Sequence, residues 1–158
     1  MKRGSVALSI LLLIIIVVVN CSEKPKDYVE FVRKGYLEDY KTTTIGQAFD
    51  ASFDSPRWHA FQTDKGVIVV EFNGMTNQKM HERACRLAFA EHFGGELPEE
   101  EFKRVMASGK ARDVWTPGMP ATVQFSISLD RETFQISHLS SAAWRLLDPS
   151  DVLLVIYH

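Results

Sequence analysis

The clearest constraint on the fold is the strict alternation of apolar and polar residues over residues 122–129. The apolar positions are Val123, Phe125, Ile127 and Leu129. A period of two is typical of a β-strand with one buried and one solvated face. After a turn at residues 130–132, residues 133–139 predict the partner strand. We expect its buried face to carry Phe134 and Ile136, with His138 next in line.

A second hairpin is expected earlier in the chain. Residues 57–63 and 67–73 flank Asp64-Lys65-Gly66, in which the glycine suits a turn position of positive φ. Ile68, Val70 and Phe72 alternate on one face, and Trp58 with Ala60 or Phe61 would pack from the opposing strand. The two hairpins together predict a four-stranded antiparallel sheet.

Helical patterns surround these hairpins. A short helix is expected from Tyr28 to about Gly35, and a second one begins at Thr44, where Gln47 completes a capping box. That helix should include Phe53 and stop at Asp54-Ser55-Pro56. Residues 76–120 form a helical insertion, with one helix over residues 79–93 and another from Pro98 to Ser108-Gly109. Residues 152–157 predict a last helix, with a strand as the alternative. The fold class is therefore α+β, with helices packed on one face of the sheet.

The N-terminus carries an apolar run of fourteen residues, 6–19, directly after Lys2 and Arg3. A membrane-spanning helix needs about 20 apolar residues, so the run fits the central region of a signal peptide better. An uncleaved N-terminal membrane helix is the alternative, because residues 5–22 just reach the lower limit for a span. In either case the rest of the chain is expected to be exported.

Residues 18–21, Val-Val-Asn-Cys, resemble a bacterial lipoprotein signal, in which cleavage before a cysteine allows that cysteine to receive lipids. Asn20 stands where Gly, Ala or Ser is usual. The resemblance implies a signal peptide at residues 1–20, lipidation of Cys21, a tether at 21–27 and a single domain at 28–158. The domain would then be held in the cell envelope, on the exported side of a membrane.

A second resemblance lies in the folded part. It is carried by Gly35-Tyr36-Leu37, Thr44-Ile45-Gly46-Gln47-Ala48-Phe49, Pro56-Arg57-Trp58 with Phe61, and Val70-Glu71-Phe72-Asn73-Gly74. The pattern resembles small uncharacterised bacterial proteins that are often membrane-anchored. These motifs consist of caps, turns and aromatic core residues, so the resemblance implies a fold and no chemistry.

The charge of the chain argues against a nucleic-acid partner. Removing residues 1–20 takes away two of the 18 basic side chains and leaves 16 against 20 acidic ones. Nucleic-acid binding needs a basic face, which this balance does not favour. The sequence also shows no nucleophile elbow, which would indicate a catalytic serine. It shows no phosphate-binding loop or other cofactor motif, so we expect no cofactor.

His81 and Cys85 are the best candidates for chemistry. They are four residues apart in a predicted helix, a spacing at which both could bind one soft metal ion. His92 lies on the same stripe but about 10 Å further along the axis. A third ligand would have to come from elsewhere, for example from His59, His138 or His158. The favoured interpretation is a half-buried helix edge with two solvated histidines and a packed cysteine.

No acid, base and nucleophile are assembled in the sequence, so we do not expect an enzyme. The leading hypothesis is a non-enzymatic interaction module in the cell envelope, contacting a protein partner through the sheet edge or the insertion. The alternatives are a metal- or small-ligand-binding envelope protein using His81 and Cys85, and a single-pass membrane protein.

Overall fold

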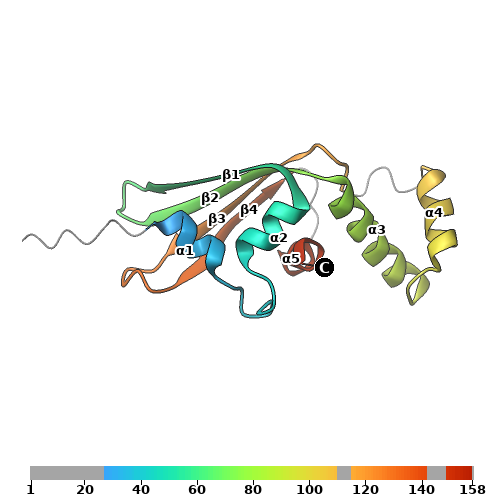
Figure 1. Ribbon diagram of the computed structural model, residues 1–158, viewed down its shortest axis with the longest axis horizontal. Coiled ribbons are helices and arrows are strands. Elements are labelled where there is room, and N and C mark those ends of the chain that lie inside the picture. Colours follow the sequence, from blue (N-terminus) through green and yellow to red (C-terminus); the bar gives the residue numbers. More distant parts are fainter. Residues whose placement is uncertain (1–26, 110–114, 142–148, 158) are drawn as a thin grey trace, which may run out of the picture.

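The computed structural model describes residues 27–109, 115–141 and 149–157, and its strands form one antiparallel sheet in the order β1-β2-β3-β4 (Figure 1). The strands are β1 (Phe53–Gln62), β2 (Ile68–Thr76), β3 (Pro120–Ile127) and β4 (Phe134–Ser141). The helices are α1 (Tyr28–Lys34), α2 (Ile45–Ser52), α3 (Gln78–Phe93), α4 (Glu99–Ala107) and α5 (Pro149–Tyr157). The α+β class, the two hairpins and the helical insertion between them are confirmed.

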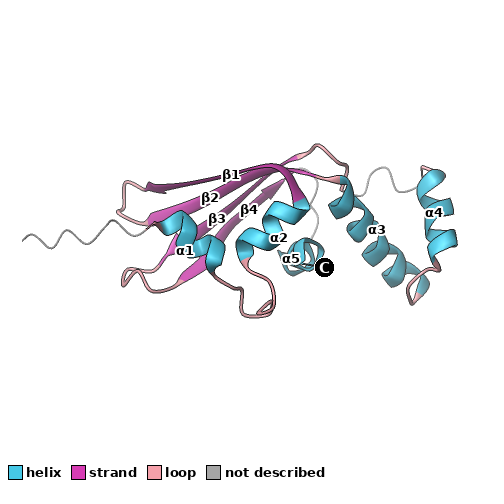
Figure 2. Cartoon of the chain, in the orientation of Figure 1, coloured by secondary structure: helices cyan, strands magenta, loops and turns pink. Residues whose placement is uncertain are grey.

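The main core lies between the sheet and the helices α1, α2 and α5, which share one face of the sheet (Figure 2). Phe49 of α2 is at its centre, with its ring centroid 4.9 Å from that of Phe72 and 5.9 Å from that of Phe125. Both phenylalanines come from the alternating positions of β2 and β3 that the sequence marks as apolar. No helix in the described ranges covers the opposite face of the sheet (Figure 2).

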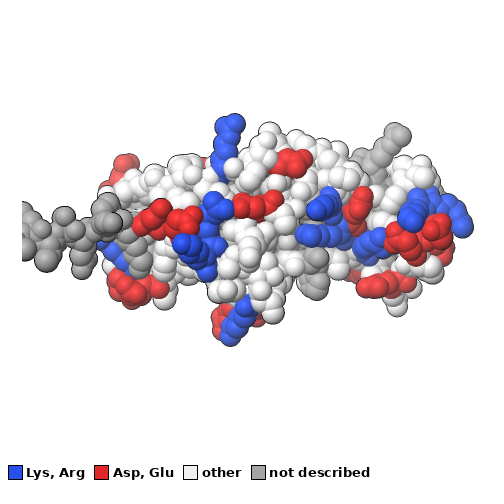
Figure 3. All heavy atoms as spheres, in the orientation of Figure 1, with Lys and Arg blue, Asp and Glu red and all other residues white. Residues whose placement is uncertain are grey.

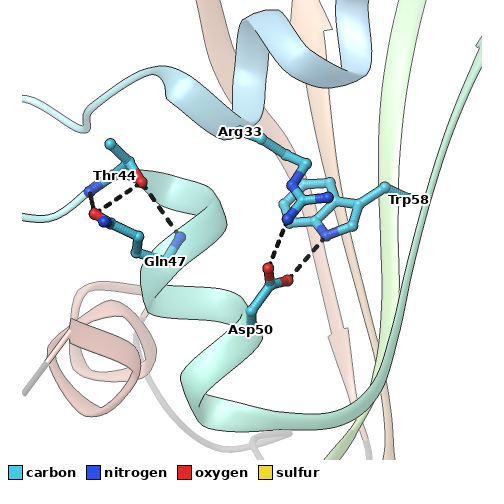
Figure 4. A network of polar contacts seen from close by, with 5 residues as sticks. All are labelled: Arg33, Thr44, Gln47, Asp50 and Trp58. Atoms are coloured by element: carbon cyan, nitrogen blue, oxygen red, sulfur yellow. Dashed lines mark hydrogen bonds and ion pairs between the residues drawn. The ribbon is translucent and has the colours of Figure 1, made fainter.

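The capping box of α2 is also confirmed. The Gln47 backbone N–H donates to Thr44 Oγ1 at 3.3 Å, and the Thr44 N–H donates to Gln47 Oε1 at 3.2 Å (Figure 4). Two backbone N–H groups at the start of α2, which have no partner within the helix, are thereby hydrogen-bonded. Further along α2, Asp50 accepts hydrogen bonds from Arg33 of α1 at 2.6 Å and from Trp58 of β1 at 3.4 Å. This carboxylate joins three elements across the edge of the core (Figure 4).

The predicted end of α2 is wrong. The helix ends at Ser52, and Phe53 begins β1, so that Asp54-Ser55-Pro56 lies inside a strand. One extra residue between Asp54 and Arg57 forms a bulge, where Ser55 has φ 53°. Proline is tolerated there because β1 is an edge strand. The cause is tertiary: Phe53 is buried, with its ring 4.9 Å from that of Phe72.

The predicted place of His138 is wrong as well. A register shift pairs Gln124 with His138 but Phe125 with Ile136, which leaves Ser137 as an extra residue. The bulge reverses the alternation, so Leu139 instead of His138 follows Ile136 towards the core. Leu129 was expected in the apolar row of β3, but the strand ends at Ile127 and Leu129 is 96% exposed in the turn.

Thr76 connects the two ends of the insertion, at the points where the chain leaves β2 and returns to β3. Its hydroxyl donates to the Thr116 carbonyl at 2.7 Å and accepts from the Met119 N–H at 3.0 Å. Its backbone carbonyl accepts from the Gly118 N–H at 2.7 Å. The side chain is fully buried, so these bonds satisfy groups that burial would otherwise leave unpaired. Residues 76 and 116–119 therefore form the stem from which α3 and α4 extend.

Arg83 of α3 fixes the C-terminal helix in place. Its Nη1 donates to Ser52 Oγ at 3.0 Å and to the Ile156 carbonyl at 3.3 Å, and Ser52 Oγ also donates to that carbonyl at 2.8 Å. A cation and a hydroxyl at the last carbonyls satisfy the end of α5 and complement its dipole. Residues 149–157 are thus a helix, and the alternative of a final strand is excluded.

Within the described ranges, no helix combines the length and the apolar character that crossing a membrane requires. Residues 6–19 and Cys21 lie outside those ranges.

Candidate functional site

The helices α3 and α4 form a hairpin that occupies one end of the elongated molecule, while α1 lies towards the other end (Figure 1). Asn77 caps α3 by accepting from the Met80 N–H at 2.9 Å, and Gly94 ends the helix in the left-handed conformation. Glutamates fill the first turn of α4, where the helix dipole favours negative charge. These local signals in the sequence are sufficient to predict both helices.

α3 contributes Met80 and Ala84 to the main core, and the partly buried Leu87 packs against it. The rest of the hairpin has a separate cluster, in which Cys85 and Phe102 are buried. Its partly buried members are Phe89, Leu97 and Met106. The distal part of the hairpin is therefore stabilised by its own contacts rather than by the sheet.

Arg86 links the two helices of the hairpin. Its guanidinium lies 3.9 Å from the centre of the Phe102 ring and donates to Glu99 at 2.7 Å. The hydrogen bond from Arg86 lowers the pKa of Glu99. Basic and acidic groups alternate over this end of the molecule, with no large region of one sign in the view of Figure 3.

An apolar surface is exposed at the tip of the hairpin. Phe93 is 60% exposed, with its ring 6.4 Å from that of Phe89. Phe89 in turn lines a small cavity of about 110 Å³, together with Leu97, Phe102 and other residues of the hairpin. Pockets for small molecules usually measure about 300–1,000 Å³, so this cavity is suited to one inserted side chain rather than to a whole ligand.

His81 and Cys85 lie together as their spacing predicts. Cys85 Sγ is 3.8 Å from His81 Nδ1 and 3.9 Å from Nε2, and both residues are buried. The expected packed cysteine is confirmed, and the expectation that His81 is solvated is wrong. Burial, and secondarily the charge of Glu82, raises the pKa of the Cys85 thiol to about 11. A metal would have to displace a proton that burial holds firmly.

The structure does not bring a third ligand to this pair. Across residues 27–109, 115–141 and 149–157, no three His, Cys, Asp or Glu side chains are grouped so as to hold a metal ion. His92 is on the exposed distal part of α3, 4.8 Å from the Phe93 ring. His59 and His138 belong to the sheet, and His158 and the predicted lipidation site Cys21 lie outside the described residues. Metal binding by His81 and Cys85 stays a prediction.

The uncovered face of the sheet carries a polar row that the sequence analysis missed. Strand register places His59, Glu71, Gln124 and His138 side by side across the four strands. Glu71 is central: its two oxygens accept from Asn73 at 2.8 Å and from Gln124 at 2.6 Å. The alternation in β2 could have placed Glu71 on this face, but only the bulge in β4 brings His138 to it.

Glu71 remains a carboxylate in this row. Burial alone would raise its pKa, but the hydrogen bonds from Asn73 and Gln124 and the nearby His59 and His138 together lower it. With both oxygens already bonded, Glu71 organises its neighbours instead of offering a free base. The row is an ordered polar surface, in which His59 Nε2 lies 3.7 Å from Glu71 Oε1.

The resemblance to small membrane-anchored bacterial proteins, carried by the segments around Gly35, Thr44, Trp58 and Glu71, stays a prediction. No protein-family model, curated protein or solved structure matches the chain.

Proposed function

We propose that the chain is an exported, membrane-tethered protein whose domain acts as a non-enzymatic binding module in the cell envelope. Its partner is a protein that inserts an apolar side chain at the tip of the α3–α4 hairpin. The observation that carries this proposal is the exposed ring of Phe93, 6.4 Å from that of Phe89, which lines a cavity of about 110 Å³. Exposed aromatic residues close to a pocket are typical anchors of protein interfaces.

The position of the hairpin supports this function. A tether of seven residues, 21–27, spans at most about 25 Å when fully extended, so it would hold the α1 end near the membrane. The α3–α4 hairpin and α1 lie towards opposite ends of the long axis of the molecule (Figure 1). A tethered domain would thus present the hairpin away from the lipid surface.

The chemistry of the most nucleophilic side chain is consistent with a role other than catalysis. Cys85 is fully buried, and its pKa of about 11 leaves very little thiolate at neutral pH. The thiolate is the form that attacks a substrate, so this cysteine is better suited to packing than to nucleophilic catalysis.

Site-specific photocrosslinking tests the interface. A photoreactive phenylalanine analogue replaces Phe93 in the full chain in native membranes, and a matched control places it at Phe61, an exposed phenylalanine of β1. We expect an adduct with one partner from position 93 and none from position 61. The purified partner should bind the Phe93→Ser variant at least tenfold more weakly. Equal adducts from both positions, or unchanged binding by Phe93→Ser, would refute the hairpin as the interface.

The intact mass of the native protein tests the anchor. A mass that corresponds to cleavage before Cys21 plus acyl chains, lost in Cys21→Ala, supports the lipoprotein. A full-length mass would instead favour the single-pass membrane protein, with residues 6–19 retained as a membrane helix.

A further inference from the structure

A second surface feature lies at the α1 end of the molecule, independent of the hairpin. It is a groove of about 660 Å³ between α1, the segment that follows it, and the start of β4. This volume is within the range of about 300–1,000 Å³ that is usual for ligand sites. The groove is therefore large enough for several side chains of a peptide.

The floor of the groove is aromatic and rigid. The Phe31 and Phe134 rings meet edge to face, with their centroids 5.5 Å apart. Gly35 allows this arrangement, because a Cβ at that position would be 2.6 Å from Phe134 Cε1. Tyr36 extends the apolar surface towards solvent and is 52% exposed. An apolar side chain bound here would contact rings that are already held in place.

The rim of the groove is acidic. Asp27, Glu30, Glu38 and Glu132 supply four carboxylates, and Lys34 is the one basic side chain among the lining residues. Lys34 is already paired with Glu30 at 3.1 Å. The lining thus has a formal charge of −3, and Figure 3 shows carboxylates over α1 and the turn between β3 and β4. Such a field attracts cations and repels anionic surfaces.

We propose that this groove binds a cationic amphipathic peptide segment of a partner protein. An apolar side chain of that segment lies on Phe31, Phe134 and Tyr36. Lysine or arginine side chains on either side of it pair with Glu38 and the other rim carboxylates. Charge complementarity with an apolar floor selects this class of ligand over neutral or acidic peptides.

The test uses the full chain and a labelled probe, acetyl-Lys-Leu-Lys-Trp-Lys-amide, with fluorescence polarisation at two salt concentrations. We expect saturable binding that weakens as salt rises, and at least tenfold weaker binding of the probe in which glutamine replaces each lysine. Glu38→Lys and Tyr36→Ala should each weaken binding at least fivefold. Both side chains are exposed, and unchanged thermal melting would show that the variants are folded.

The control variant is Glu91→Lys, which makes the same charge change on the exposed surface of α3, far from the groove. It should leave the affinity unchanged. Absence of binding, or equal weakening by Glu91→Lys, would overturn the proposal.

Discussion

Gly74 is a glycine inside β2, where the missing side chain would normally weaken a strand. The structure explains it by the close approach of aromatic rings: a Cβ on residue 74 would be 2.7 Å from Phe72 Cζ and 2.9 Å from Phe53 Cβ. We expect Gly74→Ala to lower the free energy of unfolding by about 1–3 kcal/mol, since one methyl group overfills the core. Urea denaturation measures this change. The control is Gly95→Ala, where no atom lies within 4 Å of the added methyl and a change below about 0.5 kcal/mol is expected.

Cys85 offers a second prediction for a single residue. At pH 8 a thiol with a pKa of about 11 is about 100-fold less ionised than one at the ordinary value of 9.0. In a Cys21→Ala chain we therefore expect a thiol reagent to label Cys85 at least 100-fold more slowly than an exposed thiol. The reference is a Cys21→Ala/Cys85→Ala/Ser108→Cys chain. Labelling at similar rates in the two chains would contradict the buried thiol and reopen a reactive role for Cys85.

At the scale of the elements, Glu71 on the uncovered face makes the stability of the sheet depend on pH. The pKa of Glu71 is below its ordinary value of 4.5, so its stabilising contribution is complete above about pH 5 and is lost as the pH falls through the folded-state pKa. Gln124→Leu removes one hydrogen bond to the carboxylate. We expect this variant to lower the free energy of unfolding by about 1.5–3 kcal/mol at pH 7 and by clearly less at pH 3. A carboxyl NMR titration should show a higher pKa for Glu71 in the variant.

The control for this effect is Ser126→Val, which changes the same face of β3 without touching Glu71. Its effect on stability should be the same at pH 7 and pH 3. If Gln124→Leu also behaves identically at the two pH values, the hydrogen bond to the ionised Glu71 does not contribute as proposed.

For the whole molecule, the two separate apolar clusters predict two levels of stability. Phe102 is buried in the hairpin cluster and has no part in the main core. Phe102→Ala should lower the free energy of unfolding of that cluster by about 3–5 kcal/mol, so the distal hairpin should unfold locally. Hydrogen exchange should accelerate in α4 and the end of α3, while β2 and β3 keep their protection.

The matched control for this prediction is Phe93→Ala in the same hairpin. Because Phe93 is 60% exposed, exchange in α4 should remain close to that of the parent chain. Loss of protection in β2 and β3 together with α4 in the Phe102→Ala variant would show that the molecule unfolds as one unit.

Features that depend on residues close together in the sequence could be predicted, and features that depend on distant residues could not. Helix starts and ends were predicted at Thr44, Gly94 and Pro149, because caps depend on residues three or four positions apart. The strand boundary at Phe53 and the face of His138 were not, because the first follows from burial of Phe53 against Phe72 and the second from the bulge in β4. A bulge is decided by which residues the neighbouring strand presents, and that information lies far away in the sequence.

The sequence by itself determined the α+β class, both hairpins and the helical insertion, since alternation, capping and turn glycines act locally. It also placed His81 next to Cys85, because four residues make one helical turn. Only the tertiary structure decided the row around Glu71, the separate core of the hairpin and the acidic groove beside Phe134. The row joins residues 59 to 138 and the groove joins residues 27 to 134, and these residues meet because burying the aromatic core fixes the register of the strands. The hairpin core joins residues 85 to 106, and only the packing of α4 on α3 separates it from the main core.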